Sequence, residues 1–198
     1  MKQWIVTFLL VSLSFGAFAQ MTETKEITLE DIWTNYTFSQ KRVPGFNFLQ
    51  DGKHYTRLEK GTVKKYDLVT GDFVSDIFAL EGMRSYTFSP DEKMMLVKTD
   101  SESIYRRSSK DRYFVVDISS GERTEVFTKG LISNPSWSPN GKRIAFTYEN
   151  NLFVKDLATE EIVQITEDGV YNQIINGMAD WVYEEEFGFT RAFEWNAD

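Results

Sequence analysis

The sequence contains no cysteine, and its single histidine is His54. Without cysteine the chain forms no disulfide and offers no thiolate nucleophile, so its stability has to come from packing. One histidine cannot supply a histidine-rich metal site, and the sequence lacks the aspartate spacing of a calcium-binding loop. We therefore expect neither a metal ion nor another cofactor.

Proline is scarce as well, with 4 residues, whereas aromatic residues make up 15% of the chain and hydrophobic residues 41%. Aromatic side chains favour strands, so this composition indicates a β-rich globular fold rather than a disordered chain. The formal net charge is −8. Nucleic acids and anionic membranes repel a surface of that sign, so neither is an expected partner.

Residues 1–19 have the pattern of a secretory signal peptide. Lys2 supplies the positive start, Trp4–Phe15 is apolar, and Ala17-Phe18-Ala19 has the small-x-small cleavage pattern. The apolar run is too short for a comfortable membrane span. We predict cleavage after Ala19 and a periplasmic or secreted protein that begins at Gln20. A buried N-terminal helix is the alternative.

Residues 20–39 form a lead-in segment in which we expect a short helix. Within Ile27–Trp33, Thr28 is a candidate N-cap and Asp31 is its candidate capping-box partner. The region from residue 40 to residue 198 then begins to repeat.

The first repeated unit is a turn between two apolar strands. It occurs as Phe88-Ser89-Pro90-Asp91, as Trp137-Ser138-Pro139-Asn140-Gly141-Lys142, and in a degenerate copy as Phe48-Leu49-Gln50-Asp51-Gly52-Lys53. Proline sets the first turn position, and Asn, Asp or Gly accepts the left-handed one. Apolar strands are expected to follow the first two copies, at Met94–Val97 and Ile144–Thr147.

The second repeated unit is a strand that closes into a polar turn. Its copies are Tyr66–Gly71, Val116–Gly121 and Lys155–Glu160, and the strands expected after them are Phe73–Ile77, Arg123–Phe127 and Ile162–Thr166. Two hairpins in each period of about 40–50 residues are typical of a propeller blade. We therefore predict an all-β fold, with three blades of a β-propeller from about Phe46 to Thr166. A meandering sandwich is the alternative, but it does not explain why both turn types recur in step.

The segment Asp180–Phe187 places three glutamates directly after a tryptophan and a tyrosine. In a helical turn Glu185 and Glu186 are about 100° apart and can converge on one small target. A primary ammonium suits two carboxylates, because it offers three N–H donors and one positive charge. The other interpretation is a solvated acidic face on a surface turn.

The sequence Asp-Trp-Val-Tyr-Glu-Glu-Glu resembles the glutamate motif of the dipeptidyl peptidase IV family, serine peptidases of the prolyl oligopeptidase clan. The resemblance implies that the motif lies on a short helical excursion from a propeller. It also implies that Glu185 and Glu186 hold the free N-terminus of a peptide substrate. The segment Ile27–Trp33 is similar to the segment that often precedes the first blade in this family.

The second blade is longer than the third, and the excess lies in Ser101–Lys110. The resemblance implies that an arginine in this loop binds the backbone carbonyl of the penultimate substrate residue. Counting back from the strand Tyr113–Ile118 assigns that role to Arg106, with Arg107 as the alternative. A guanidinium suits it, because it donates a fork of hydrogen bonds and offsets two nearby carboxylates. A solvated basic pair is the other interpretation.

A fourth blade is expected to begin near Ile174, with its first strand interrupted by the glutamate segment and resumed at Arg191–Trp195. Trp195–Asp198 then matches Trp137–Asn140, so the chain is expected to be an N-terminal fragment that stops inside a hairpin. The resemblance implies an eight-bladed propeller followed by an α/β-hydrolase domain with a Ser-Asp-His triad. The sequence has no Gly-x-Ser-x-Gly, so we expect no catalytic residue here and no activity of the chain alone.

Two functions follow as hypotheses. The first is the substrate-recognition part of an exported dipeptidyl peptidase that removes X-Pro or X-Ala dipeptides from free N-termini. For the full-length protein, the family resemblance implies a homodimer. The second is a non-enzymatic periplasmic propeller that binds protein or peptide partners. The repeats suit both functions, whereas the glutamate motif and Arg106 favour the first.

Overall fold

The computed structural model describes residues 26–40 and 44–196. The chain divides into two compact units, Met1–Val43 and Pro44–Asp198, which are described separately. The predicted signal peptide, residues 1–19, lies outside the described residues. The two helices of the described part, five and seven residues long, are too short to cross a membrane.

In the first unit the described residues form helix α2 (Leu29–Trp33). Thr28 is its N-cap, and the Thr28 hydroxyl accepts a hydrogen bond from the Asp31 backbone N–H at 3.1 Å. The Asp31 carboxylate accepts one in return from the Thr28 N–H at 3.5 Å. This reciprocal pair satisfies donors that the first turn of a helix leaves free, and it confirms the predicted capping box.

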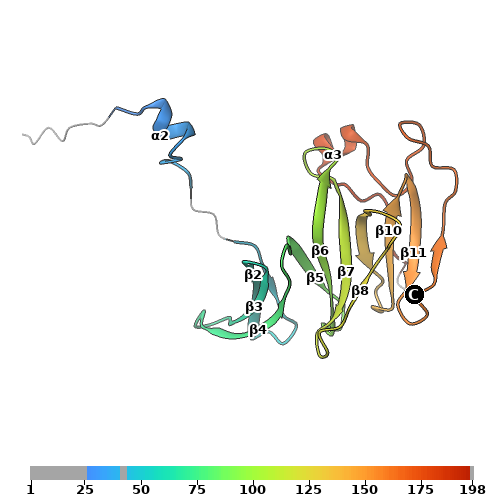
Figure 1. Ribbon diagram of the computed structural model, residues 1–198, viewed down its shortest axis with the longest axis horizontal. Helices are drawn as coiled ribbons and strands as arrows, with labels where there is room; N and C mark the ends of the chain where they lie inside the picture. The colour runs from blue at the N-terminus through green and yellow to red at the C-terminus, as the bar shows by residue number, and fades with distance from the viewer. Residues whose placement is uncertain (1–25, 41–43, 197–198) are drawn as a thin grey trace, which may run out of the picture. The chain divides into compact units, whose positions relative to one another are not determined.

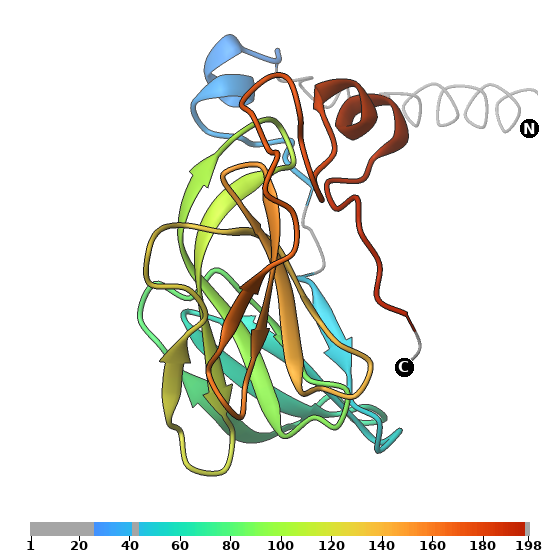
Figure 2. The ribbon, with the colours of Figure 1, turned by 90° about the vertical axis from the view of Figure 1, so that its right-hand side faces the viewer.

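The second unit consists of three four-stranded antiparallel sheets, each made of consecutive strands (Figures 1 and 2). The sheets are β1 (Phe46–Phe48), β2 (His54–Glu59), β3 (Thr62–Asp67) and β4 (Phe73–Ala79); β5 (Ser85–Phe88), β6 (Met94–Ser103), β7 (Ser109–Asp117) and β8 (Arg123–Glu125); and β9 (Ser133–Trp137), β10 (Arg143–Tyr148), β11 (Asn151–Asp156) and β12 (Ile162–Gln164). They are the three predicted blades, and together they form an open, partial propeller.

The first repeated turn is closed by its serine. The Ser89 hydroxyl accepts a hydrogen bond from the Met94 N–H at 2.9 Å, and the Ser138 hydroxyl accepts one from the Arg143 N–H at the same distance. Both serines are buried. In the first blade Leu49 occupies this position and has no hydroxyl, so that copy of the turn is degenerate in structure as well as in sequence.

Turns of successive blades touch each other. The Gln50 side-chain amide donates to the Pro90 carbonyl at 2.6 Å, which joins the first turn of blade 1 to that of blade 2. In blade 3, Gly141 has a φ of +70°, and a Cβ there would lie 3.3 Å from Cδ of Pro90. Glycine therefore suits position 141 for two reasons. It adopts the left-handed turn conformation without strain, and it leaves room for Pro90 of the neighbouring blade.

The second repeated turn is organised by one aspartate in each blade. Oδ1 of the aspartate accepts backbone N–H bonds from the residues two and three positions later, at 2.8–3.2 Å. The residues are Asp67, Asp117 and Asp156. These bonds favour the charged carboxylate, so the pKa of all three lies below its usual value.

We expect Asp117→Asn to destabilise the protein in a pH-dependent way. The Ser119 hydroxyl and then the Ser120 N–H lower the pKa of Asp117 to about 2, whereas an unfolded aspartate titrates near 3.9. The carboxylate therefore contributes stability that is fully present above about pH 5 and is lost progressively as the pH falls through about 3.9 toward 2. Urea unfolding at pH 6, 4 and 3 should show the difference between wild type and Asp117→Asn shrinking at each step. A difference that stays constant with pH would contradict this assignment.

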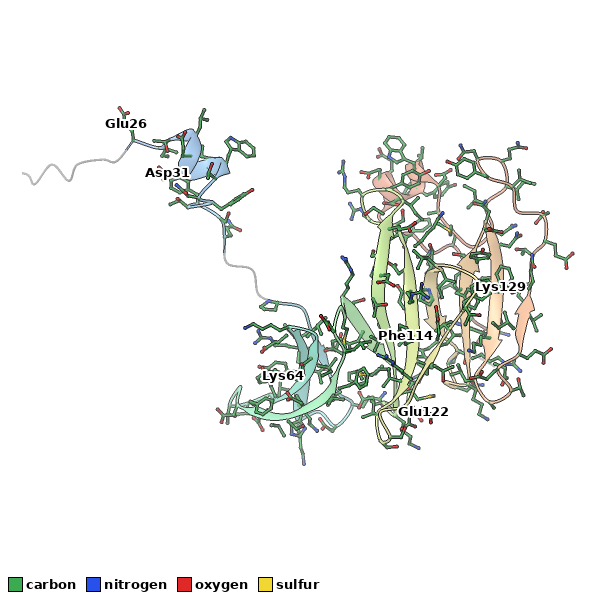
Figure 3. The ribbon with its side chains drawn as sticks, viewed as in Figure 1. Glu26, Asp31, Lys64, Phe114, Glu122 and Lys129 are labelled. Carbon is green, nitrogen blue, oxygen red and sulfur yellow. The ribbon has the colours of Figure 1, made fainter. Side chains whose placement is uncertain are left out.

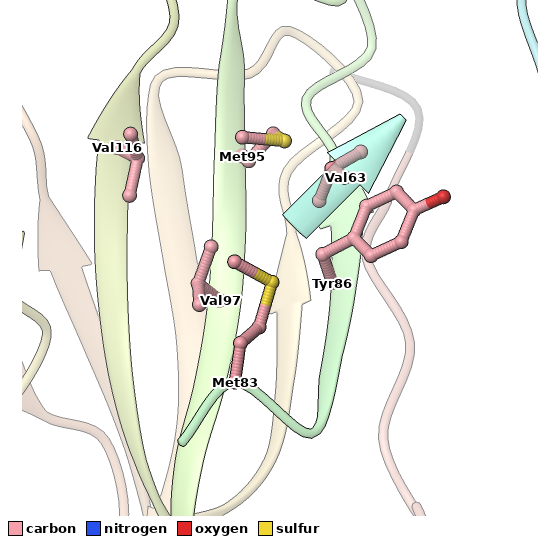
Figure 4. Close-up of a cluster of buried hydrophobic side chains, with 6 residues drawn as sticks. All are labelled: Val63, Met83, Tyr86, Met95, Val97 and Val116. Atoms are coloured by element: carbon pink, nitrogen blue, oxygen red, sulfur yellow. The ribbon is translucent and has the colours of Figure 1, made fainter. Parts of the chain in front are cut away.

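The cluster between blades 1 and 2 is built from both sheets (Figure 4). Val63 projects from β3, while Met95, Val97 and Val116 project from β6 and β7, and all four are fully buried. The cluster also contains Tyr86, whose hydroxyl donates to Oγ1 of Thr56 in blade 1 at 2.7 Å.

A second cluster fills the space between blades 2 and 3. Leu96 points to this side because it alternates along β6 with Met95 and Val97. Phe127, Ile144 and Phe146 pack against it. Both faces of blade 2 are therefore buried against neighbouring sheets.

The outer face of blade 1 carries a row of rings from consecutive strands. Tyr55 and Tyr66 stack with centroids 5.3 Å apart, and Phe73 meets Tyr66 edge-on at 6.0 Å. Nζ of Lys64, labelled in Figure 3, lies 5.1 Å from the centroid of Phe73. Phe73 is 54% exposed, so part of this row of rings remains in contact with solvent.

The extra residues of blade 2 extend a hairpin. Strands β6 and β7 have 10 and 9 residues, against 6 in each of β10 and β11. Glu102 pairs with Lys110 and Ser103 with Ser109. Only residues 104–108, here called the hairpin tip, form the loop that the sequence analysis expected over all of 101–110.

The predicted first strand of a fourth blade, Arg191–Trp195, is not formed as a strand in the described residues. Arg191 makes an isolated bridge with Met178, and the Trp195 indole donates to the Ser136 carbonyl at 3.3 Å. A strand requires several consecutive pairings. Met178 and Arg191 lie on either side of the helical excursion. Among the described residues, their single bridge is the one β-type pairing that Arg191 makes.

Candidate functional site

The glutamate segment forms helix α3 (Trp181–Phe187), as predicted. Asp180 is its N-cap, and the Asp180 carboxylate accepts from the Tyr183 N–H at 2.9 Å. Gly188 ends the helix with a φ of 75°, a left-handed conformation that glycine adopts without strain. Both ends of this two-turn helix are therefore specified locally.

The excursion that carries α3 is fixed to blade 3 at its base. The Asn134 side chain and Thr190 exchange two hydrogen bonds of 2.9 Å, from Nδ2 to the Thr190 carbonyl and from the Thr190 hydroxyl to Oδ1. The Ala179 N–H donates to the same carbonyl at 3.0 Å, which closes the excursion on itself. These contacts hold α3 beside the hairpin tip of blade 2 (Figures 1 and 2). We call this arrangement of α3 and the tip the helix–hairpin corner.

Arg106 and Glu185 meet at this corner. A terminal nitrogen of the Arg106 guanidinium lies 3.2 Å from Oε2 of Glu185. The Glu185 side chain is only 15% exposed, whereas that of Arg106 is 75% exposed. The structure thus brings together two of the three side chains named as candidate binding residues, and the guanidinium keeps donors open to solvent.

Glu186 and Arg107 are exposed residues of the same corner. Among the described residues, none forms a hydrogen bond or ion pair with the Glu186 carboxylate. Arg107 is held at the corner by a hydrogen bond from its backbone N–H. Of the two arginines considered, it is therefore Arg106 whose side chain pairs with a motif glutamate.

Glu184 is the fully buried member of the acidic run. Its Oε1 accepts hydrogen bonds from the backbone N–H groups of Arg107 at 2.5 Å and Ser108 at 3.1 Å. Burial by itself raises the pKa of Glu184. The Ser108 hydroxyl, the two N–H groups and the positive charge of Arg107 outweigh that effect and hold the pKa below its usual value. The carboxylate is therefore charged at neutral pH although solvent does not reach it.

A functional role for Glu184 was not predicted from the sequence. In the helix its side chain is turned toward the hairpin tip and away from solvent. No local pattern indicates its partners, because they are backbone groups 76 and 77 residues earlier in the chain.

The segment that carries the carboxylates also carries several aromatic side chains. Tyr183 contacts Phe187 and Phe189, with ring centroids 5.4 and 5.7 Å apart. Trp181 is 56% exposed and Phe187 is 67% exposed. The corner therefore combines an ion pair and a free carboxylate with exposed aromatic side chains, a combination suited to a ligand that is cationic at one end and apolar beside it.

Other chemistry finds no support in the described part of the chain. It holds no group of three or more histidine, aspartate and glutamate side chains placed to share a metal ion. Nδ1 of His54 lies 2.6 Å from Oδ2 of Asp51 in blade 1. The Asp51 carboxylate also accepts hydrogen bonds from the backbone N–H groups of Lys53 and His54, so this contact belongs to the first turn of blade 1.

Comparison with known proteins identifies relatives of the whole region. The family described as "Dipeptidyl peptidase IV (DPP IV) N-terminal region" matches residues 89–198, which include the hairpin tip and α3. Human "Prolyl endopeptidase FAP" is 32% identical over 181 residues, covering 86% of this chain and 23% of that protein. A "Probable dipeptidyl-aminopeptidase B" of Coccidioides posadasii is 40% identical over 114 residues, covering 56% of this chain and 12% of that protein.

A solved structure shows the same arrangement of sheets. The dipeptidyl peptidase 4 of Porphyromonas gingivalis superposes with a TM-score of 0.77 and 31% sequence identity, over 85% of this chain and 26% of that one. The chain thus spans about a quarter of the length of this relative and of the human one.

Proposed function

Because this chain belongs to the dipeptidyl peptidase IV N-terminal region family, we propose that it is the substrate-recognition part of an exported serine peptidase of this kind. The peptidase removes X-Pro or X-Ala dipeptides from free N-termini. Glu185 and Glu186 bind the substrate ammonium, and Arg106 binds a backbone carbonyl close to it. The observation that carries the proposal is the Arg106–Glu185 ion pair at the helix–hairpin corner.

The charges of the corner support a cationic ligand. Glu185 and Glu186 contribute two negative charges and Arg106 one positive charge, which leaves a net charge of −1. A peptide ammonium brings that sum to zero and supplies three donors to carboxylate oxygens. Glu185 is mostly shielded from water, so its attraction for a cation is screened less than that of an exposed carboxylate.

The role assigned to these residues is one of positioning. Binding the ammonium and a nearby carbonyl fixes the substrate at two points along its backbone. A rigid hold of this kind presents one peptide bond at a set distance from the corner, and such orientation lowers a reaction barrier without contact with the reacting atoms. It also excludes peptides whose N-terminus is blocked.

The proposal predicts that this chain prefers a free amine. Glycyl-prolinamide should bind about tenfold more tightly than its N-acetyl derivative, which corresponds to about 1.4 kcal/mol. This magnitude lies between that of an exposed ion pair and that of a buried one, because the corner is partly open. Chemical-shift titration of the amide signals of residues 104–108 and 181–189 measures both affinities.

The control is a matched pair of glutamate variants. Glu185→Gln should remove the preference for the free amine, whereas Glu102→Gln, an exposed residue of the same hairpin, should leave it unchanged. Equal affinity of the wild-type chain for the two peptides would contradict the proposed function. It would favour a propeller that binds partners without reading their N-terminus.

A further inference from the structure

Glu184 is a third glutamate of the motif with a task different from that of its neighbours. We propose that Glu184 is a positioning residue, which ties the hairpin tip to α3 so that the Arg106 guanidinium stands beside Glu185. Its significance for peptide binding rests on the proposed function, whereas the tie itself can be tested without a ligand.

The two hydrogen bonds of Glu184 fall at the point in the tip where they control Arg106. The N–H of Arg107 belongs to the peptide unit that starts at the Arg106 carbonyl carbon, so holding that N–H fixes the plane of this peptide unit. The Ser108 N–H is held by the same carboxylate oxygen. Two consecutive peptide units immediately after Arg106 are therefore fixed to the helix.

The tip is closed on itself as well as tied to α3. The Ser108 carbonyl accepts hydrogen bonds from the N–H groups of Ile104 at 2.9 Å and Tyr105 at 3.4 Å. Ser108 thus contacts the start of the tip through its carbonyl and Glu184 through its N–H. A displacement of Ser108 would move the whole loop on which Arg106 lies.

Two contacts tie the hairpin tip to α3: the Arg106–Glu185 ion pair and the hydrogen bonds accepted by Glu184. The Arg106–Glu185 pair involves a side chain that is 75% exposed, and exposed ion pairs hold long side chains in place weakly. Glu184 is fully buried, and hydrogen bonds to a charged acceptor are roughly twice as strong as neutral ones. Of the hydrogen bonds and ion pairs between the described residues of the tip and α3, only the weak pair would remain without Glu184. The position of Arg106 therefore depends on Glu184.

Amide hydrogen exchange tests the tie directly. In Glu184→Ala the N–H groups of Arg107 and Ser108 should exchange about ten- to a hundredfold faster than in the wild type, since each loses a charged acceptor. In Glu184→Gln the amide oxygen remains in place, so the acceleration should be clearly smaller. Glu102→Ala, on the same hairpin, should leave both rates unchanged. Unchanged rates in a folded Glu184→Ala chain would overturn the proposal.

Spin labels test whether the tip then moves. Because the chain has no cysteine, Tyr105→Cys and Val182→Cys place single labels on the tip and on α3, at side chains that are 40% and 50% exposed. The distance distribution between them should be narrow, and it should broaden when Glu184→Ala is added. Glu184→Gln should restore much of the narrow distribution. If Glu184→Ala does not fold, Glu184→Met, which fills similar space without an acceptor, takes its place, and wild-type exchange rates together with a wild-type distribution in that variant would overturn the proposal.

A double-mutant cycle connects the tie to peptide binding. If Glu184 acts through Arg106, Glu184→Ala should weaken binding of glycyl-prolinamide in the wild-type background and have no further effect in Arg106→Ala. Additive losses would mean that Glu184 acts otherwise, and would overturn the assignment. Should the wild-type chain not distinguish free from acetylated peptide, the proposed function fails, while the exchange and spin-label results still decide whether Glu184 positions the tip.

Discussion

Replacing Phe146 by alanine is expected to lower the free energy of unfolding by about 3–5 kcal/mol. Phe146 is fully buried in the cluster between blades 2 and 3. Its ring lies 5.1 Å from that of Phe127 and stacks on that of Phe153 at 5.7 Å. Phe153 belongs to strand β11, which is paired on both sides, and Phe127 is buried shortly after β8, so the site has little freedom to collapse into the cavity.

Urea unfolding followed by circular dichroism measures this loss, and Phe73→Ala is the matched control. Phe73 is the same residue type on the outer face of blade 1, but it is 54% exposed. Its removal creates no enclosed cavity, so the expected loss is about 1 kcal/mol or less. Similar losses for the two variants would mean that the interface between blades 2 and 3 is not a close-packed core.

The second large effect is expected for Asp111→Ala, with a loss of about 3 kcal/mol. The Asp111 side chain is 3% exposed, and its Oδ2 accepts hydrogen bonds from Nζ of Lys98 at 3.1 Å and from the Ser109 hydroxyl at 2.7 Å. Truncation leaves the Lys98 ammonium, which is 22% exposed, without its counter-charge. The loss should therefore lie near the lower end of the range for buried pairs.

Two further variants separate the charge effect from lost packing. Adding Lys98→Met to Asp111→Ala removes the orphaned ammonium and should recover a large part of the stability. Asp76→Ala breaks the Lys64–Asp76 pair, in which Asp76 is 58% exposed, and should cost less than about 1 kcal/mol. If Lys98→Met brings no recovery in urea unfolding, the cost of Asp111→Ala does not come from an unpaired charge.

The three blades could be predicted from sequence because their turns are encoded locally. Ser89 and Ser138 each bond to a residue five positions later, and Asp117 bonds to residues two and three positions later. Side chains of this type in this order specify a turn whatever surrounds them. Strand positions then follow from the apolar runs on either side.

The features that were not predicted depend on pairing partners that the residue pattern does not indicate. The pairing of Glu102 with Lys110 makes an extended hairpin of residues that looked like a polar loop. At Arg191–Trp195 the apolar pattern resembles a strand, yet a strand also needs a neighbour, which a pattern cannot supply.

At the site, the resemblance to a known motif indicated Arg106 and Glu185, and the structure brings these two together. The buried position of Glu184 was not predicted. A burial signal in sequence is normally an apolar residue at the right period, and a glutamate followed by two more glutamates carries the opposite signal. Only the contact with the backbone of the hairpin tip explains it.

The separation in sequence between Glu184 and Ser108 has a consequence for the order of folding. Each blade consists of consecutive hairpins, and contacts between near neighbours form early because they close short loops. During synthesis the second blade is complete before α3 has been made. We therefore expect the corner to assemble last, onto sheets that already exist. The same few long-range bonds make it the part that opens first, so the proposed peptide-binding site can be lost and regained by local opening while the blades stay folded.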